Sequence, residues 1–287
     1  MGDRDGRKPE WLKKTWRLSE EMRGVEGLVR DLGLNTVCRE ASCPNYAECF
    51  GRGTATFMIL GACCTRNCGF CGVAHAVPEP VDPEEPARVA EAVKSLGLTY
   101  AVITSVTRDD LEDGGAAQFA GTVREIKRLC PNTKVEVLIP DFGGSEAALD
   151  LVIASGPEVI SHNMETVRAL YDKVRPQADY DRSLGILKRV ASSGDGIKCK
   201  SGVMAGVGET DEQMLALMDD LRKAGCEFLT IGQYMRTSPE NIPVEAYVEP
   251  GVFERWAQEA RRKGFEFVAS APFVRSSYHA EEWTSAK

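Results

Sequence analysis

The uneven placement of cysteine constrains this chain more than any other feature. Seven of the ten cysteines in 287 residues fall between Cys38 and Cys71. The cysteine content is too low for a disulfide-stapled scaffold, and the N-terminus lacks the apolar stretch of a secretory signal. We therefore expect a cytoplasmic protein, because clustered thiols in a reducing compartment bind metal or take part in chemistry more often than they form disulfides.

Composition narrows the classes of protein that the chain can belong to. Hydrophobic residues make up 43% and charged residues 27%, which are ordinary values for a globular protein with a sizeable core. No apolar run approaches the roughly 18 residues of a membrane span, so we expect no membrane association. The formal net charge of −8 disfavours a nucleic acid as the main partner.

Short β-rich runs alternate with amphipathic stretches of helical length along most of the chain. This alternation predicts an α/β fold with a parallel sheet and right-handed crossovers. Six units are too few for a full barrel, so we expect a partial (β/α)6 barrel, with a doubly wound sheet as the alternative. The expected strands are 56–60, 100–104, 134–139, 158–161, 197–201 and 228–232, and the expected helices are 86–95, 116–129, 145–154, 183–193 and 211–224.

The pattern also suggests three parts. Residues 1–53 form a mostly irregular N-terminal extension with one helix at 19–32, residues 54–265 form the partial barrel, and the tail 266–287 has no clear period. Ligands of parallel α/β folds bind at the carboxyl ends of the strands. The loop after the first strand, GACCTRNCGFCGV, is therefore the place to look for chemistry.

The first cysteine triad has the spacing Cys64-x3-Cys68-x2-Cys71 and lies on this loop. Three thiolates can hold three corners of a cubane iron–sulfur cluster, which leaves the fourth iron with an open position. A zinc site completed by His75, or simple packing of small cysteines, fits the isolated spacing as well. We expect Cys63 to be structural, because only Cys64 gives the spacing of the triad.

The second cysteine triad, Cys38-x4-Cys43-x5-Cys49, precedes the barrel. Taken alone, its spacing fits zinc, a second cluster or plain packing. Two cysteine triads in one short segment are much rarer than either triad alone. Together they favour two metal centres.

At these residues the chain resembles a known family. The first triad, with Phe70 inside it, is similar to the radical S-adenosylmethionine (SAM) signature, and CREASCPNYAEC resembles the auxiliary-cluster motif of lipoyl synthases. The segments TSVTRDDLEDGG, HNMETV, KSGVMAGVGET and VRSSYHA resemble further blocks of that family, and the likeness extends from Trp11 to His279. Departures at Ala62, Ser161 and 235–237 touch no cluster thiol.

The resemblance implies two [4Fe–4S] clusters and SAM as cofactors, and it assigns no catalytic side chain because the cofactors carry the chemistry. Cys64, Cys68 and Cys71 would hold the cluster that binds SAM. The implied SAM contacts are Phe70 beside the adenine, Thr104, Ser105 and Asp109 near the methionyl part, Asn163 and Glu165 at the ribose, and Arg175 and Lys200 at the carboxylate. Helix capping by 104–109 and ordinary ion pairs of Arg175 and Lys200 are the structural alternatives.

The auxiliary cluster would be held by Cys38, Cys43, Cys49 and Ser277, so that the tail folds back to the N-terminal extension. The implied reaction inserts two sulfur atoms at C6 and C8 of an octanoyl chain on a lysine of a carrier domain, of the 2-oxoacid dehydrogenase E2 or glycine cleavage H protein type. Further partners would be an electron donor such as ferredoxin or flavodoxin and an iron–sulfur carrier that rebuilds the cluster.

Two other classes of function remain open at this point. One is a different radical enzyme that modifies a peptide or an RNA, and the segment RSSY counts against it. The other is a ferredoxin-like electron carrier or a zinc-stapled binding module. A scaffold of more than 200 residues is larger than such a carrier needs.

Overall fold

An eight-stranded sheet organises the residues that the computed structural model describes, which are 8–15, 19–194 and 196–284. The spatial order of the strands is β1-β2-β5-β6-β7-β8-β9-β10. Neighbouring strands from β2 to β10 are parallel, and β1 is antiparallel to β2. The strands are β1 (Asn35–Thr36), β2 (Thr56–Ile59), β5 (Tyr100–Ser105), β6 (Lys134–Leu138), β7 (Val159–Ser161), β8 (Lys198–Ala205), β9 (Phe228–Gln233) and β10 (Phe267–Ser270).

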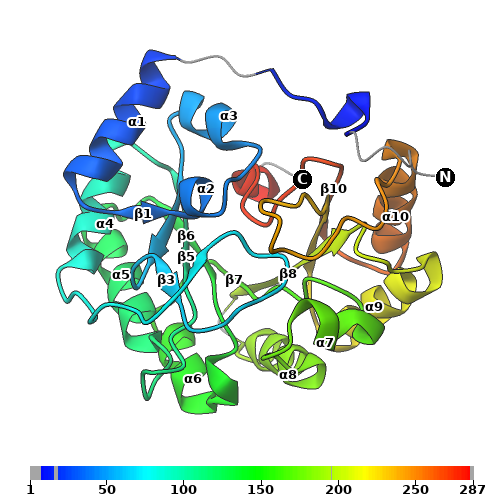
Figure 1. Cartoon of the computed structure of the whole chain (residues 1–287). Helices are drawn as coiled ribbons and strands as arrows, with labels where there is room; N and C mark the ends of the chain where they lie inside the picture. Colours follow the sequence, from blue (N-terminus) through cyan, green and yellow to red (C-terminus); the bar gives the residue numbers. More distant parts are fainter. Residues whose placement is uncertain (1–7, 16–18, 195, 285–287) are drawn as a thin grey trace.

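The topology is that of an open barrel. Strand order follows chain order without the reversal that defines a doubly wound sheet, and the crossover helices surround the strands (Figure 1). The edge strands β1 and β10 do not pair with each other, so the sheet is not closed. The predicted partial barrel is therefore confirmed, and the alternative of a doubly wound sheet is wrong.

Helix starts are encoded locally by capping side chains. Ser145, Asp179 and Thr210 each accept a hydrogen bond from the backbone N–H three residues later, which satisfies a donor that the first helical turn leaves free. Thr210 and Gln213 complete a capping box. The crossover helices are α4 (Glu85–Ser95), α5 (Ala116–Leu129), α6 (Glu146–Ala154), α8 (Tyr180–Ala191), α9 (Asp211–Lys223) and α10 (Pro250–Arg262).

All six expected strands and all five expected helices of the barrel are present, but the prediction omitted the last helix and the last strand of the sheet. The tail was expected to be without regular structure, whereas its residues Phe267–Ser270 form β10, parallel to β9. Helix α10 was also missed, although Phe253, Trp256, Ala257 and Ala260 have helical spacing and are buried. The long segment 234–249, which contains no helix or strand, interrupts the alternation and conceals this last unit.

The N-terminal extension is more regular than expected and packs on the barrel. Helix α1 (Glu20–Asp31) confirms the predicted helix and buries Met22, Val25 and Val29 in the same apolar core as the barrel strands. The strand β1 then adds to the sheet edge, and the two short helices α2 (Val37–Glu40) and α3 (Tyr46–Gly51) follow. The cysteines of the second triad are thus placed beside the first barrel strand.

The last described residues of the C-terminal tail lie at the N-terminal ends of the barrel strands. Its short helix η4 (Ala280–Thr284) carries Trp283, whose ring packs on Tyr100 and Phe228, the first residues of β5 and β9. Among the described residues, no helix is long and apolar enough to cross a membrane.

Candidate functional site

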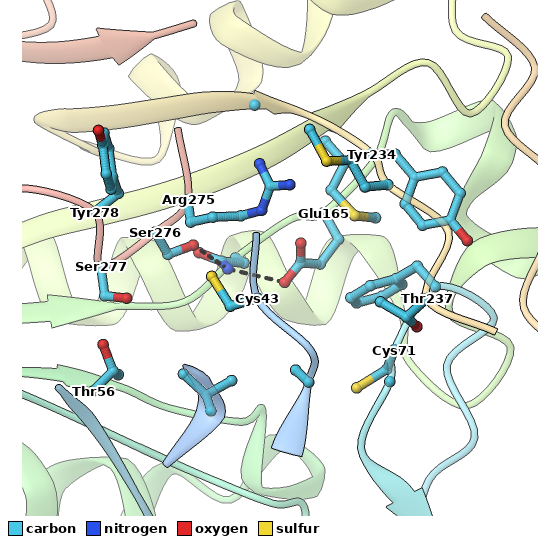
Figure 2. A pocket seen from close by; sticks show the side chains of 18 of the residues that line it. Cys43, Thr56, Cys71, Glu165, Tyr234, Thr237, Arg275, Ser276, Ser277 and Tyr278 are labelled. Carbon is cyan, nitrogen blue, oxygen red and sulfur yellow. Dashed lines mark hydrogen bonds between the residues drawn. The ribbon is translucent and has the colours of Figure 1, made fainter. Parts of the chain in front are cut away.

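One cavity of about 890 Å³ lies at the carboxyl end of the barrel strands. This volume is near the upper end of the range for small-molecule sites, which is about 300–1,000 Å³. Both cysteine triads and the RSSY segment reach it, and Figure 2 shows Cys43, Cys71, Glu165 and Ser277 facing the same space. The structure therefore brings together segments that are more than 200 residues apart in the chain.

The loop that carries the first triad is fixed to the barrel by a buried arginine. Arg66, which lies between Cys64 and Cys68, donates to both carboxylate oxygens of Asp109 at 2.7 Å and to Asp141 Oδ1 at 2.7 Å. Burial alone would raise the pKa of Asp141, but the hydrogen bond from Arg66 lowers it to about 2. Such a paired, desolvated arginine gives the loop one defined position.

This arrangement changes the role of Asp109. The family resemblance implied that Asp109 lies near the methionyl part of SAM, whereas the structure uses both of its oxygens to hold Arg66 and leaves it outside the cavity lining. Asp109 therefore positions the cysteine loop instead of facing the ligand. The alternative that 104–109 cap a helix is also wrong, because α5 begins only at Ala116, with Gly115 as its N-cap.

Backbone contacts hold the other side of the same loop. Gly69 N–H donates to Val174 O at 3.0 Å, and Gly69 O accepts from Ile242 N at 2.8 Å. A Cβ at Gly69 would lie 2.8 Å from the Ile242 side chain, so this position requires glycine. The Asn241 amide donates to Cys71 O at 2.9 Å, and the loop is thus tied to the segment that follows β9.

The second triad is held by two short helices beside β2. Cys38 lies in α2, Cys49 lies in α3 and Cys43 lies between them, where its N–H donates to Cys38 O at 3.0 Å. Burial raises the pKa of Cys38 to about 11 and that of Cys49 to about 12, with further contributions from neighbouring triad thiols. These thiols are protonated at neutral pH, so metal binding there has to displace protons.

The first triad shows the same electrostatic pattern. Burial raises the pKa of Cys68, and it raises the pKa of Cys71 to about 12. Within the described ranges, no three His, Cys, Asp or Glu side chains converge on a single metal ion. Three thiolates can hold three corners of a cubane cluster and leave its fourth iron open. The His75 ring bonds the Cys64 carbonyl, not a triad thiol.

The tail folds back to the second triad, as was expected if Ser277 is a ligand of the auxiliary cluster. Ser277 lines the cavity together with Cys38, Cys43 and Cys49, and Figure 2 shows its hydroxyl near Thr56. Neighbouring contacts fasten the tail to α3: Asn45 donates to Phe273 O at 2.7 Å, and Tyr278 donates to Glu48 at 2.7 Å.

Glu48 is the centre of this attachment. Burial would raise its pKa, but hydrogen bonds from Lys14, Tyr278 and His279 outweigh that effect and lower the pKa to about 2. Its carboxylate therefore joins the N-terminal segment, α3 and the tail at neutral pH.

Six of the eight predicted SAM contacts line the cavity: Phe70, Thr104, Ser105, Asn163, Glu165 and Arg175. Three polar atoms of this set, Ser105 Oγ, Asn163 Oδ1 and Arg175 Nε, are buried and have no partner among the described residues. Buried polar groups are normally paired, so this part of the cavity fits a polar ligand with its own donors and acceptors. Thr104 is less available, because its hydroxyl donates to Leu138 O at 3.1 Å.

Glu165 combines two unusual properties. Its φ of 66° lies in the left-handed region that a non-glycine residue rarely adopts, and burial raises its pKa although the charge of Arg175 opposes the effect. Strained residues of this kind persist where the surrounding structure requires them, often at ligand sites. Asn163 donates to its carboxylate at 2.9 Å.

Lys200 does not lie at the cavity. Its ammonium pairs with Glu136 at 2.7 Å inside the barrel, where the two side chains are 2% and 0% exposed. Tyr100 donates to the second oxygen of Glu136 at 2.7 Å, and Trp283 of the tail donates to the Tyr100 hydroxyl at 2.9 Å. The predicted contact of Lys200 with SAM is replaced by this internal ion pair.

Several site residues were missed from the sequence. His162 lines the cavity and bonds Ile139 O and Ser183 Oγ, and burial lowers its pKa to about 4, so it is neutral. Arg275 lies partly buried in the cavity wall, where desolvation lowers its pKa against the opposing charges of Cys43 and Glu165. The block VRSSYHA contained Arg275, but its position toward the second triad depends on the path of the tail.

Comparison with known proteins agrees with this geometry. The model of the radical SAM superfamily matches residues 58–221. The chain is 53% identical over 276 residues to a lipoyl synthase of Alkaliphilus metalliredigens, covering 96% of this chain and 95% of that protein. It is 54% identical over 275 residues to a lipoyl synthase of Caldanaerobacter subterraneus, with 96% of each covered.

Solved structures support the fold. Methylornithine synthase superposes with a TM-score of 0.55 at 15% identity and covers 93% of this chain and 86% of its own. A maturase of the [FeFe]-hydrogenase superposes with a TM-score of 0.57 at 16% identity and covers 74% of this chain and 55% of its own. With both cysteine triads and the RSSY tail at one barrel mouth, and with this identity over nearly its whole length, the chain belongs to the lipoyl synthase family of radical SAM enzymes.

Proposed function

We propose that the two triads divide the work of sulfur insertion at C6 and C8 of an octanoyl chain on a carrier lysine. The first triad serves radical formation, and the second holds the sulfur that is inserted. The predicted adenine and ribose contacts Phe70, Asn163 and Glu165 together form the predicted nucleoside site. The observation that supports this division most directly is that both triads, the RSSY segment and this nucleoside site line one cavity. A reactive alkyl radical can act only on a target held close to it in a closed site.

Cys64, Cys68 and Cys71 would hold a [4Fe–4S] cluster whose fourth iron is free for the amino and carboxylate groups of SAM. When bound, the cluster and SAM would together supply one-electron reduction of the sulfonium and, through it, removal of hydrogen from the substrate. The chain contributes position: Arg66 and Gly69 fix the loop on the barrel. The aromatic ring of Phe70, which lines the cavity, gives the adenine an apolar surface.

Asn163, Glu165 and Arg175 would orient the rest of SAM. The Glu165 carboxylate can accept from two ribose hydroxyls, and the unpaired Asn163 Oδ1 supplies another acceptor. Arg175 already donates from Nη1 to Asn163 O and to the Tyr171 hydroxyl, while its Nε is unpaired and free for a carboxylate. The three side chains thus present complementary donors and acceptors from one wall.

Cys38, Cys43, Cys49 and Ser277 would hold the auxiliary cluster, which when bound supplies sulfide to the substrate. The serine is the informative ligand, because an alkoxide is a harder ligand than a thiolate and a poorer match for this site. A mismatched fourth ligand leaves more readily, which suits a centre that has to open. The tail that carries Ser277 is attached through side chains and lies at the cavity wall.

The proposal includes partners and compartment. An octanoylated carrier domain has to reach the cavity mouth, where Lys8 and Lys13 lie in the lining. A low-potential donor such as ferredoxin or flavodoxin would supply electrons, and an iron–sulfur carrier would rebuild the auxiliary cluster. The cytoplasm is the compartment that keeps such thiols reduced.

Mass spectrometry of an octanoylated carrier peptide tests this proposal. The peptide is incubated anaerobically with reconstituted protein, SAM and dithionite. We expect a mass gain from two sulfur atoms together with 5′-deoxyadenosine. Deoxyadenosine without any change in the peptide would contradict the proposed substrate, and a protein with both clusters that forms neither product would contradict the enzyme assignment.

A further inference from the structure

A hydrogen-bonded bridge joins the predicted nucleoside site to the RSSY tail. The Asn163 amide uses both of its donors: Nδ2 donates to Glu165 Oε1 at 2.9 Å and to Ser276 Oγ at 2.6 Å (Figure 2). Ser276 is the residue next to Ser277, the proposed fourth ligand of the auxiliary cluster. Only one side chain therefore separates the residue that would bind ribose from the peptide that carries the cluster serine.

The barrel wall is shaped to permit this bridge. A Cβ at Gly202 of β8 would lie 2.7 Å from Asn163 Oδ1, 2.8 Å from Ser276 Oγ and 2.9 Å from Thr230 Oγ1. Gly202 has no left-handed φ, so glycine is needed there for space and not for conformation. Any larger residue at this position would push the bridge apart.

A second glycine leaves space for the backbone of the tail. A Cβ at Gly232 of β9 would lie only 2.0 Å from Val274 O, so the tail backbone passes directly against this strand. The tail is thus seated over two neighbouring strands at positions without side chains. The seat of the segment 271–279 is therefore narrow and defined.

Binding of a nucleoside would strengthen the bridge for a simple electrostatic reason. The free acceptor of the bridge is Asn163 Oδ1, which is buried and unpaired in the described structure. A ribose hydroxyl that donates to this oxygen polarises the amide and makes its N–H groups better donors, as in other hydrogen-bond chains. Strengthening the bond to Ser276 favours the docked tail, and by linkage the docked tail favours SAM to the same extent.

We propose that Ser276 is a positioning residue that couples occupancy of the nucleoside site to docking of the tail segment that carries Ser277. The coupling rests on the proposed function, because it takes Asn163 and Glu165 as ribose contacts. It would keep the auxiliary cluster fully ligated while SAM is bound. Loss of the nucleoside would loosen the serine ligand.

Hydrogen–deuterium exchange of the reconstituted protein, with and without SAM and without reductant, measures this coupling directly. In the unaltered protein we expect SAM to slow exchange in peptides covering 271–279. In Ser276→Ala this protection should be lost, and SAM should bind about fivefold more weakly, as for one lost hydrogen bond. Ser270→Ala is the matched control on the same tail, because its hydroxyl donates to Phe253 O outside the cavity lining.

Gly202→Ala gives an independent variant that keeps Ser276. It should reproduce the loss of SAM-dependent protection, whereas Ser270→Ala should retain it. Equal protection by SAM in Ser276→Ala and in the unaltered protein would overturn the inference while leaving the proposed function intact. Failure of SAM to bind the unaltered protein with both clusters loaded would overturn the proposed nucleoside site and the inference with it.

Discussion

The two cysteine triads share one cavity but are held in different ways. The first lies on a single loop that a buried arginine and backbone hydrogen bonds fasten to the barrel. The second lies on two short helices and is completed by a tail from the other end of the chain. The difference teaches that one centre is placed by the barrel itself, whereas the other depends on the docking of two chain ends. A centre that has to give up sulfur is suited to the second kind of support.

Removing one thiol from each triad gives the largest expected effect. Cys68→Ala should abolish SAM cleavage, since the site of the open iron is lost. Cys43→Ala should retain SAM cleavage but form no sulfur-containing product. Assays of 5′-deoxyadenosine and of the carrier peptide by mass spectrometry separate the two results. Deoxyadenosine formation by Cys68→Ala, or a lipoylated peptide from Cys43→Ala, would break the division of roles.

Arg66→Met tests the rigid support of the first triad. The substitution leaves the buried carboxylate of Asp141, which is 0% exposed, without its main partner. Loss of one partner from a buried ion pair costs about 3–5 kcal/mol in the free energy of unfolding. Anaerobic urea denaturation measures this cost. Arg189→Met, which removes an exposed pair with Asp150, is the control and should change stability little; equal stability of the two variants would refute the role of Arg66.

The buried ring of His162 predicts that the free energy of unfolding falls as the pH is lowered. Its folded pKa of about 4 lies below the ordinary value of 6.5, because burial disfavours the charged ring. Its contribution to stability is therefore complete above pH 6.5 and declines as the pH falls toward 4, by about 3 kcal/mol in total. In His162→Asn the fall in stability between pH 7.5 and 5 should be shallower, as measured by urea denaturation. His75→Asn is the exposed control, and an unchanged pH dependence in His162→Asn would contradict the assignment.

Trp283→Ala tests the dependence of the second triad on the tail, with the smallest expected cost. Trp283 is half-buried, so we expect the free energy of unfolding to fall by about 2 kcal/mol, which is below the range for a fully buried tryptophan. Because η4 anchors the end of the tail, the auxiliary cluster should lose iron to a chelator faster while the first cluster is unaffected. Trp11→Ala, at an exposed tryptophan, is the control. Equal acceleration at both clusters would argue against separate support.

Local signals in the sequence predicted much of the molecule. The alternating runs gave six barrel strands and five helices within a few residues of their observed ends, because burial pattern and capping act over short distances. The two triads were predicted from their motifs, and Ser277 from the family resemblance, as ligands of two separate clusters, and the structure places all of them at one cavity. The same reasoning could have predicted helix α10, because its apolar residues have helical spacing in the sequence.

What the sequence determined by itself was the set of chemical groups: the thiols, their spacing on two segments and the strand–helix alternation. What only the tertiary structure decided was which polar groups meet. Asp109 and Lys200 looked like ligand contacts, but Arg66 and Glu136, from distant segments, pair with them instead. Their partners lie 43 and 64 residues away. Pairing at such separations is set by how strands and loops stack around the barrel, and a buried charge takes whichever opposite charge that stacking brings to it.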